Sequence, residues 1–207
     1  MISIARLLLF FVITMGYNAF FRNTVKMNRS LTWVFTFSII TLVLYLGSLL
    51  GFMLQTVYAI SVLGCLLSLY YLWAVWKKKY RFRRLDYIAL GMMAYLLLFG
   101  ITLWHSPLLH YDNFTHWATI VKFFHINNAL PTQQDTIISY YTYPVGSSLF
   151  IYFFTTIVGF SEGSMLVGQF FLIASSLYAM FAALRDDRRV LMVSMIFASF
   201  AVFNTFN

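Results

Sequence analysis

The sequence carries little charge. Of its 207 residues, 14 are basic and six are acidic, so charged residues make up 10% of the chain, against about 25% in an ordinary soluble domain. Hydrophobic residues make up 61%. This balance excludes an ordinary water-soluble globular domain.

Cysteine and proline are also scarce. The single cysteine, Cys65, lies within a long apolar run. One cysteine provides neither a disulfide framework nor a thiolate cluster for a metal ion. The three prolines all fall between residues 105 and 146.

That same stretch, residues 105–146, is the one long polar interruption in the chain. It contains all four histidines, and it also contains Asp112 and Asp135, two of the six acidic residues. The ionisable chemistry of the protein is therefore concentrated here, and this stretch is the candidate site.

Apolar runs of about 20 residues occupy much of the remaining sequence. Such a run crosses a hydrocarbon core of about 30 Å as a helix, and backbone inside lipid must satisfy its own hydrogen bonds. We therefore predict an all-α, polytopic membrane protein with about six transmembrane helices, a membrane-embedded or interfacial helix and an outer-face loop. The first run is expected to remain as a helix, because basic residues follow it and no small-residue cleavage site is present. The predicted spans are residues 2–21, 31–50, 56–76, 87–104, 164–184 and 190–203.

The basic residues predict the orientation of these spans. Six Lys or Arg fall between residues 77 and 84, and such clusters favour the cytoplasmic side. This places loop 105–146 on the outer face. Residues 147–160 are too few for a normal span, so we expect them to enter the outer leaflet and return, which keeps the basic cluster at 185–189 in the cytoplasm. The net charge of +8 does not indicate nucleic-acid binding, because no basic face interleaves with exposed aromatics.

Residues 112–125 are predicted to form one interfacial helix. Phe114, Trp117, Val121 and Phe124 recur at helical spacing and form an apolar stripe that is expected to face lipid or protein. Lys122 is expected to point to water or to a headgroup phosphate.

Asp112 and His116 are four residues apart, which puts them on one face of that helix. A carboxylate beside an imidazole can act as a base with its orienting group, or can supply two metal ligands. Two simpler interpretations stand beside this one: Asp112 as a helix N-cap, and His116 as a histidine at headgroup level. The other three histidines share no such spacing and are expected at the interface.

The tyrosine-rich segment 140–146 ends in Tyr143-Pro144-Val145-Gly146. Its aromatic rings could stack against a sugar or a lipid headgroup. An aromatic belt at the membrane surface is the alternative, and it is the commoner use of tyrosine at the end of an apolar segment.

Several short motifs together resemble the first outer loop of the GT-C superfamily of membrane glycosyltransferases. They are Tyr-Asp-Asn-Phe-Thr-His-Trp at 111–117, Leu-Pro at 130–131 and Tyr-Pro-Val-Gly at 143–146. The closer resemblance is to a bacterial group with a YDE-x-SHW-type segment and a later YPPG. The resemblance covers about residues 87–207, so the chain divides into N-terminal helices with a basic loop (1–86) and a GT-C-like module (87–207).

The resemblance implies an enzyme of the plasma membrane that transfers a sugar from a polyprenyl-phosphate donor to a cell-envelope acceptor. It implies that Asp112 is catalytic, as a general base or as a ligand that helps hold a divalent metal ion. On this enzyme interpretation His116 and Lys122 face the phosphate of the donor, and Tyr143 lines the lipid entrance. Whether a divalent metal ion takes part as a cofactor is not specified by the resemblance.

Two positions depart from the group's pattern: Asn113 stands where a second acidic residue is expected, and Val145 replaces the second proline. Members of the superfamily continue into further helices and a second outer loop. We therefore expect this chain to be an N-terminal part or a shortened relative, inactive alone. The alternatives are a non-catalytic integral membrane protein and a transporter or permease subunit, although no ionisable residue lies in the middle of a predicted span.

Overall fold

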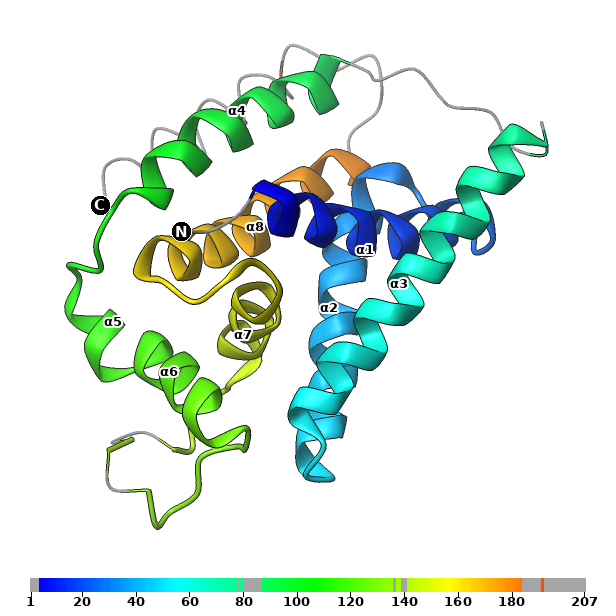
Figure 1. The fold of residues 1–207 in the computed structure, drawn as a ribbon. Coiled ribbons are helices and arrows are strands. Elements are labelled where there is room, and N and C mark those ends of the chain that lie inside the picture. The colour runs from blue at the N-terminus through cyan, green and yellow to red at the C-terminus, as the bar shows by residue number, and fades with distance from the viewer. Residues whose placement is uncertain are drawn as a thin grey trace.

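A computed structural model describes residues 4–77, 79, 87–135, 137–138, 141–183 and 191, with the side chains of residues 87, 88 and 183 left out. All regular structure in this part of the chain is helical (Figure 1), which confirms the predicted all-α class. The helices are α1 (Ile4–Asn23), α2 (Arg29–Leu49), α3 (Met53–Trp76), α4 (Tyr87–Trp104), α5 (Tyr111–Thr115), α6 (Trp117–Asn127), α7 (Gly146–Val158) and α8 (Glu162–Met180), followed by a 3-10 turn, η1 (Phe181–Ala183).

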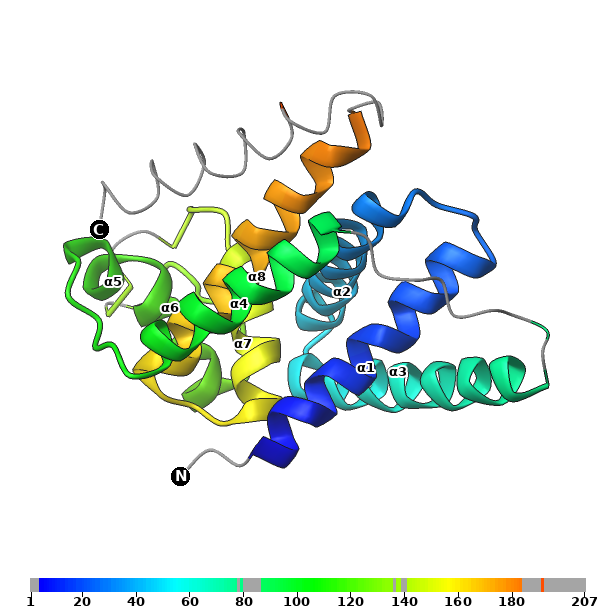
Figure 2. The ribbon, with the colours of Figure 1, turned by 90° about the horizontal axis from the view of Figure 1, so that it is seen from above.

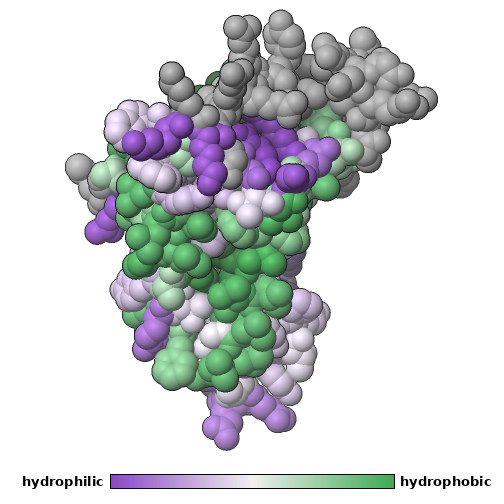
Figure 3. Space-filling model, turned by 90° about the vertical axis from the view of Figure 1, so that its right-hand side faces the viewer, coloured by the Kyte–Doolittle hydropathy of each residue, from purple (hydrophilic) through white to green (hydrophobic). Residues whose placement is uncertain are grey.

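Four of these helices are long and apolar enough to cross a membrane: α1, α2, α3 and α8. The apolar stretch described in α4, Ala89–Trp104, is shorter. The sixth predicted span, residues 190–203, lies outside the described residues apart from Leu191. Figure 3 shows the corresponding surface, an apolar band between hydrophilic groups at either end. Together these features indicate a membrane protein.

Helices α1 and α3 cross at small residues. A β-carbon added to Gly16 would lie 2.1 Å from the carbonyl oxygen of Gly64, so the two backbones approach as closely as glycine allows. Beside this crossing, the Ser68 hydroxyl donates to the Val12 carbonyl at 2.5 Å and the Tyr17 hydroxyl donates to the Ile60 carbonyl at 2.8 Å. Small residues with interhelical hydrogen bonds are the usual means of joining helices in lipid.

Helix α7 is short and lies at the centre of the fold. Its 13 residues span about 20 Å at 1.5 Å per residue, less than the roughly 30 Å of a hydrocarbon core. It packs against α1, α2, α6 and α8, and its phenylalanines contact Phe10 of α1 and Phe37 of α2. The short length agrees with the predicted non-spanning segment, and the surrounding helices supply the shielding that such a segment needs.

The helices give the molecule two distinct ends. Helices α4 and α8 run antiparallel, because Met92 clusters with Tyr178 whereas Trp104 meets Gly163. Trp33, near the start of α2, packs on the Met92 cluster. The α1–α2 loop therefore lies at one end and the segment after α4 lies at the other (Figures 1 and 2). Of the two basic clusters used for the orientation, only Lys77 and Lys79 belong to the described residues.

Candidate functional site

The predicted single helix over 112–125 is wrong, because the structure has two helices there. Helix α5 ends at Thr115 and α6 begins at Trp117, and His116 between them has φ −128° and ψ −104°. The Thr115 hydroxyl contacts both the Tyr111 carbonyl (3.2 Å) and His116 Nδ1 (2.5 Å). These side-chain bonds compete with the helical backbone ladder and accompany its interruption.

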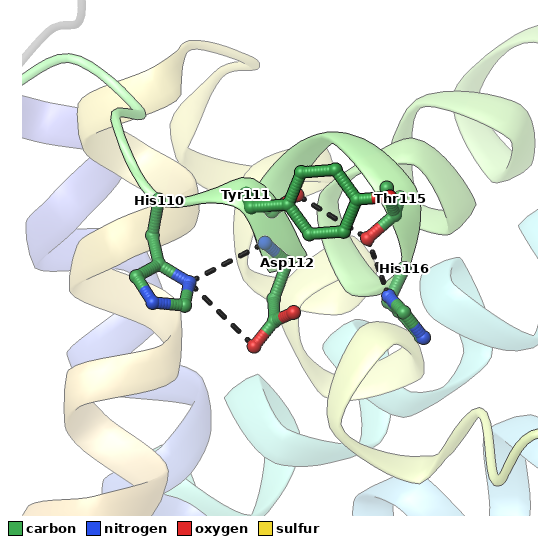
Figure 4. Close-up of polar contacts among 5 residues, drawn as sticks. All are labelled: His110, Tyr111, Asp112, Thr115 and His116. Atoms are coloured by element: carbon green, nitrogen blue, oxygen red, sulfur yellow. Dashed lines mark hydrogen bonds and ion pairs between the residues drawn. The ribbon is translucent and has the colours of Figure 1, made fainter.

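Asp112 lies in the first turn of α5 but does not cap it, so the N-cap interpretation is wrong. The N-cap is His110, whose Nδ1 accepts a hydrogen bond from the Asp112 backbone N–H at 3.3 Å. The Asp112 carboxylate oxygen Oδ2 lies 3.5 Å from the same His110 nitrogen (Figure 4). Both side chains are exposed, 59% for Asp112 and 70% for His110.

The shared nitrogen makes these two contacts alternatives. Neutral His110 with a bare Nδ1 can accept from the Asp112 N–H, whereas protonated His110 carries a hydrogen on Nδ1 and can donate it to the carboxylate. The predicted pairing of Asp112 with His116 is therefore replaced by a pairing with His110. That partner precedes Asp112 by two residues, a spacing characteristic of a capping turn.

His116 and Tyr143, both predicted to bind substrate, do come together. Their ring centroids lie 5.1 Å apart with an interplanar angle of 27°, a stacked arrangement. His116 Nδ1 is hydrogen-bonded to the Thr115 hydroxyl at 2.5 Å, which orients the ring of the stack. The stack joins the α5–α6 break to the segment that leads into α7.

Lys122 does not join this group. It is exposed on α6, one residue beyond the buried Val121, and it makes no ion pair with any carboxylate among the described residues. Its exposure agrees with the prediction that it points to water or a phosphate.

The apolar stripe is divided between the protein interior and the surface. Val121 and Phe124 are fully buried against other helices, and the partly buried Trp117 packs against the cluster that contains Val121. Phe114 is 59% exposed, and its neighbour Tyr111 is 73% exposed. The interior thus takes the α6 half of the stripe, while α5 presents its aromatic side chains outward.

Three polar contacts fix α6 to α7, and the local sequence did not reveal them. His125 Nε2 lies 2.8 Å from the Thr155 hydroxyl, the Tyr152 hydroxyl donates to Asn128 Oδ1 at 2.8 Å, and the Ser148 hydroxyl donates to the Trp117 carbonyl at 3.1 Å. Burial lowers the pKa of His125 to about 4. The His125 ring is half-buried and packs against α7, and its location at the membrane interface stays a prediction.

Glu162 ties the start of the loop to α8. Its Oε2 accepts a hydrogen bond from the Leu108 backbone N–H at 2.8 Å. The next residue, Gly163, packs so tightly on the end of α4 that an added β-carbon would lie 2.0 Å from the Trp104 carbonyl oxygen. These contacts hold the segment that carries His110 and Asp112 against two long helices.

The residues around Asp112 do not by themselves make a metal site. No group of three His, Cys, Asp or Glu side chains comes together among the described residues. Asn113, where the related pattern has an acid, is a neutral side chain with 7% exposure. One carboxylate and one imidazole would supply at most two of the ligands of a metal ion, so we assign no step to a metal ion.

Comparison of the chain with models of known protein families, with curated proteins and with solved structures finds no match.

Proposed function

We propose that this chain is a membrane glycosyltransferase, or the N-terminal part of one, that takes a sugar from a polyprenyl-phosphate donor. The observation that carries the proposal is the Asp112 carboxylate. It is exposed at the first turn of α5, shortly after the apolar helix α4, at the end of the molecule opposite the α1–α2 loop. The proposal further puts that end on the outer face of the plasma membrane, where a cell-envelope acceptor would approach.

In the proposed reaction Asp112 acts as the general base. Its carboxylate removes the proton of an acceptor hydroxyl while the hydroxyl oxygen bonds to the anomeric carbon of the sugar. The bond from that carbon to the phosphate oxygen breaks, and the polyprenyl phosphate leaves with the electron pair. Asp112 then holds the proton, and general-base action of this kind contributes about 10²–10⁴-fold to a rate.

His110 positions this base. Its Nδ1 accepts a hydrogen bond from the Asp112 backbone N–H at 3.3 Å and so caps the first turn of α5. The same nitrogen lies 3.5 Å from the Asp112 carboxylate, which leaves most of that exposed carboxylate accessible to an acceptor hydroxyl.

The stacked rings of His116 and Tyr143 provide a flat surface for the donor. Tyr143 is 49% exposed, so part of its ring is accessible to a sugar face or to the first isoprene units. Lys122 offers an exposed ammonium for the phosphate.

A non-catalytic integral membrane protein is the second candidate. The observation that favours it is the exposure of the Asp112 side chain, 59%. Catalytic sites are usually enclosed. A transporter or permease subunit has no comparable observation in its favour.

Donor binding separates the two candidates without requiring an acceptor. The full chain, reconstituted in vesicles, is photolabelled with a diazirine analogue of a polyprenyl-phosphate sugar, and the labelled peptides are mapped. The proposal predicts saturable labelling within 105–146 that excess polyprenyl-phosphate sugar abolishes and excess polyprenol does not. The proposal would be contradicted if excess polyprenol reduced the labelling as much as excess polyprenyl-phosphate sugar does. Labelling spread along all the apolar helices would contradict it as well.

A further inference from the structure

The two signs of charge are separated along the chain and in the fold. Residues 1–85 contain no aspartate and no glutamate. The acidic residues among the described part of the chain, Asp112, Asp135 and Glu162, all follow α4. Any surface built by the first three helices is therefore purely cationic in its fixed charge.

Those cations gather at one end. Arg22 closes α1, Lys26 lies in the α1–α2 loop and Arg29 opens α2. Lys77 and Lys79 follow α3. We call these five residues the basic end.

A hydrogen bond joins the two parts of the basic end. The hydroxyl groups of Thr24, just after α1, and Tyr71, near the end of α3, are bonded to each other. Both ribbon views show the loop and the end of α3 on the same side of the molecule (Figures 1 and 2). Figure 3, which looks at this side, shows hydrophilic side chains gathered above the apolar band. Lys26 itself is exposed at the tip of the turn, with φ 59°.

Aromatic residues lie beside the cations at the depth where apolar helix surface ends. Trp73 is 51% exposed and Trp76 is 71% exposed on the last turns of α3, and the Lys77 ammonium lies 4.7 Å from the Trp76 ring centroid. Val25, next to Lys26, is 52% exposed. Exposed tryptophan below a row of Lys and Arg marks the boundary between acyl chains and headgroups.

We infer that the basic end binds the headgroups of anionic phospholipids. A phosphodiester with net negative charge meets several cations and no acidic residue of the first 85, and the neighbouring tryptophans extend into the acyl region below it. Juxtamembrane cations attract anionic lipid by about a factor of five each. The inference is independent of the proposed sugar transfer, which concerns the opposite end.

The test compares lipids around the full chain. The protein is reconstituted in phosphatidylcholine vesicles with trace spin-labelled phosphatidylglycerol or phosphatidylcholine, and the fraction of each label immobilised by the protein gives a selectivity ratio. We expect a ratio clearly above one that falls as salt rises, because exposed charge interactions are screened. The triple variant K26Q/K77Q/K79Q, which removes the three exposed lysines of the basic end, should lower the ratio toward unity, and the matching variant K26R/K77R/K79R should preserve it.

Arg6→Gln is the matched control, since Arg6 is an exposed cation in the first turn of α1, away from the loop. It should leave the selectivity unchanged. A wild-type ratio near one, or an equal loss in Arg6→Gln, would overturn the inference. Loss of selectivity in inorganic phosphate, but not in chloride of equal ionic strength, would assign the surface to free phosphate and overturn its assignment to lipid.

Discussion

At the scale of single residues, Asp112 and His110 show what spacing in a sequence can and cannot reveal. The spacing to His116 and the resemblance to the GT-C loop drew attention to Asp112, and the structure gives it an exposed carboxylate. Its partner was predicted incorrectly, because the pairing with His116 assumed an unbroken helix. A break at one residue changes the face on which every later side chain lies.

His125 illustrates a residue whose role depends on a distant partner. Thr155, its hydrogen-bond partner, is 30 residues away, and nothing in the neighbourhood of either residue specifies the other. Local patterns describe which residues share a face, whereas contacts between elements depend on how those elements pack.

His125 leads to a prediction about pH. Its pKa is about 4 in the folded chain and about 6.5 when unfolded, so between these values the unfolded chain binds more protons. The free energy of unfolding should therefore fall as pH is lowered from about 6.5 to about 4. Chemical unfolding in detergent at a series of pH values measures it.

Carboxylates titrate near the lower end of that window, so the comparison requires a variant. His125→Phe keeps an aromatic ring but has no titratable group, and its unfolding free energy should depend less on pH. Parallel pH profiles for wild type and His125→Phe would show that His125 does not remain neutral in the fold.

At the scale of helices, the sequence predicted the existence and class of the elements well. The predicted span over 87–104 coincides with α4, and the predicted spans in α1, α2, α3 and α8 agree with the observed helices within a few residues. Apolar length is a strong signal because lipid leaves the backbone no alternative. The turn between α2 and α3 is shorter than predicted, since α3 already begins at Met53.

The amphipathic stripe was predicted as lipid-facing or protein-facing, and the structure divides it. We predict that a cysteine at Phe114 reacts readily with a water-soluble or headgroup-level maleimide, whereas one at Val121 reacts only after unfolding. The reason is that the native Phe114 side chain is 59% exposed, whereas that of Val121 is 0% exposed. Cys65 is replaced by alanine in both variants, and equal reactivity at the two positions would contradict the packing of α6.

The α1–α3 crossing gives a prediction about stability. Gly16→Ala should destabilise the chain by about 1–3 kcal/mol, the usual cost of forcing extra volume into packed structure, because its β-carbon meets backbone of α3 at 2.1 Å. Thermal unfolding in detergent detects the loss. Gly91→Ala is the matched control, since no atom lies within 4 Å of the added carbon, and an equal loss there would indicate that helix crossing is not the cause.

At the scale of the whole molecule, the central place of α7 was not predictable from the sequence. Its apolar run was recognised as too short to span, but the four helices that enclose it come from both halves of the chain. Enclosure of this kind is a property of tertiary packing. The largest cluster of buried residues accordingly runs from Phe10 to Phe171.

The two-ended arrangement predicts a topology that labelling can measure. In sealed vesicles, cysteines at Val25 and Leu109 should react with a membrane-impermeant maleimide from opposite sides. Both side chains are exposed, 52% and 83%, so accessibility within the protein does not limit either reaction. Labelling of both positions from one side would contradict the assignment of the basic end and loop 105–146 to opposite faces.

The central claim is that Asp112 is the base of a sugar-transfer reaction. The most direct measurement is transfer of labelled sugar from a polyprenyl-phosphate donor in membranes that contain the protein as the cell produces it, with Asp112→Asn compared with wild type. Asparagine keeps the shape of aspartate but not its basicity, so transfer should fall by about 10²–10⁴-fold, with donor photolabelling and membrane insertion retained. Asp135→Asn, which alters a carboxylate of the same loop bonded to Thr132, should transfer at the wild-type rate. An Asp112→Asn protein as active as wild type, or a wild type that transfers no sugar in those membranes, would contradict the account.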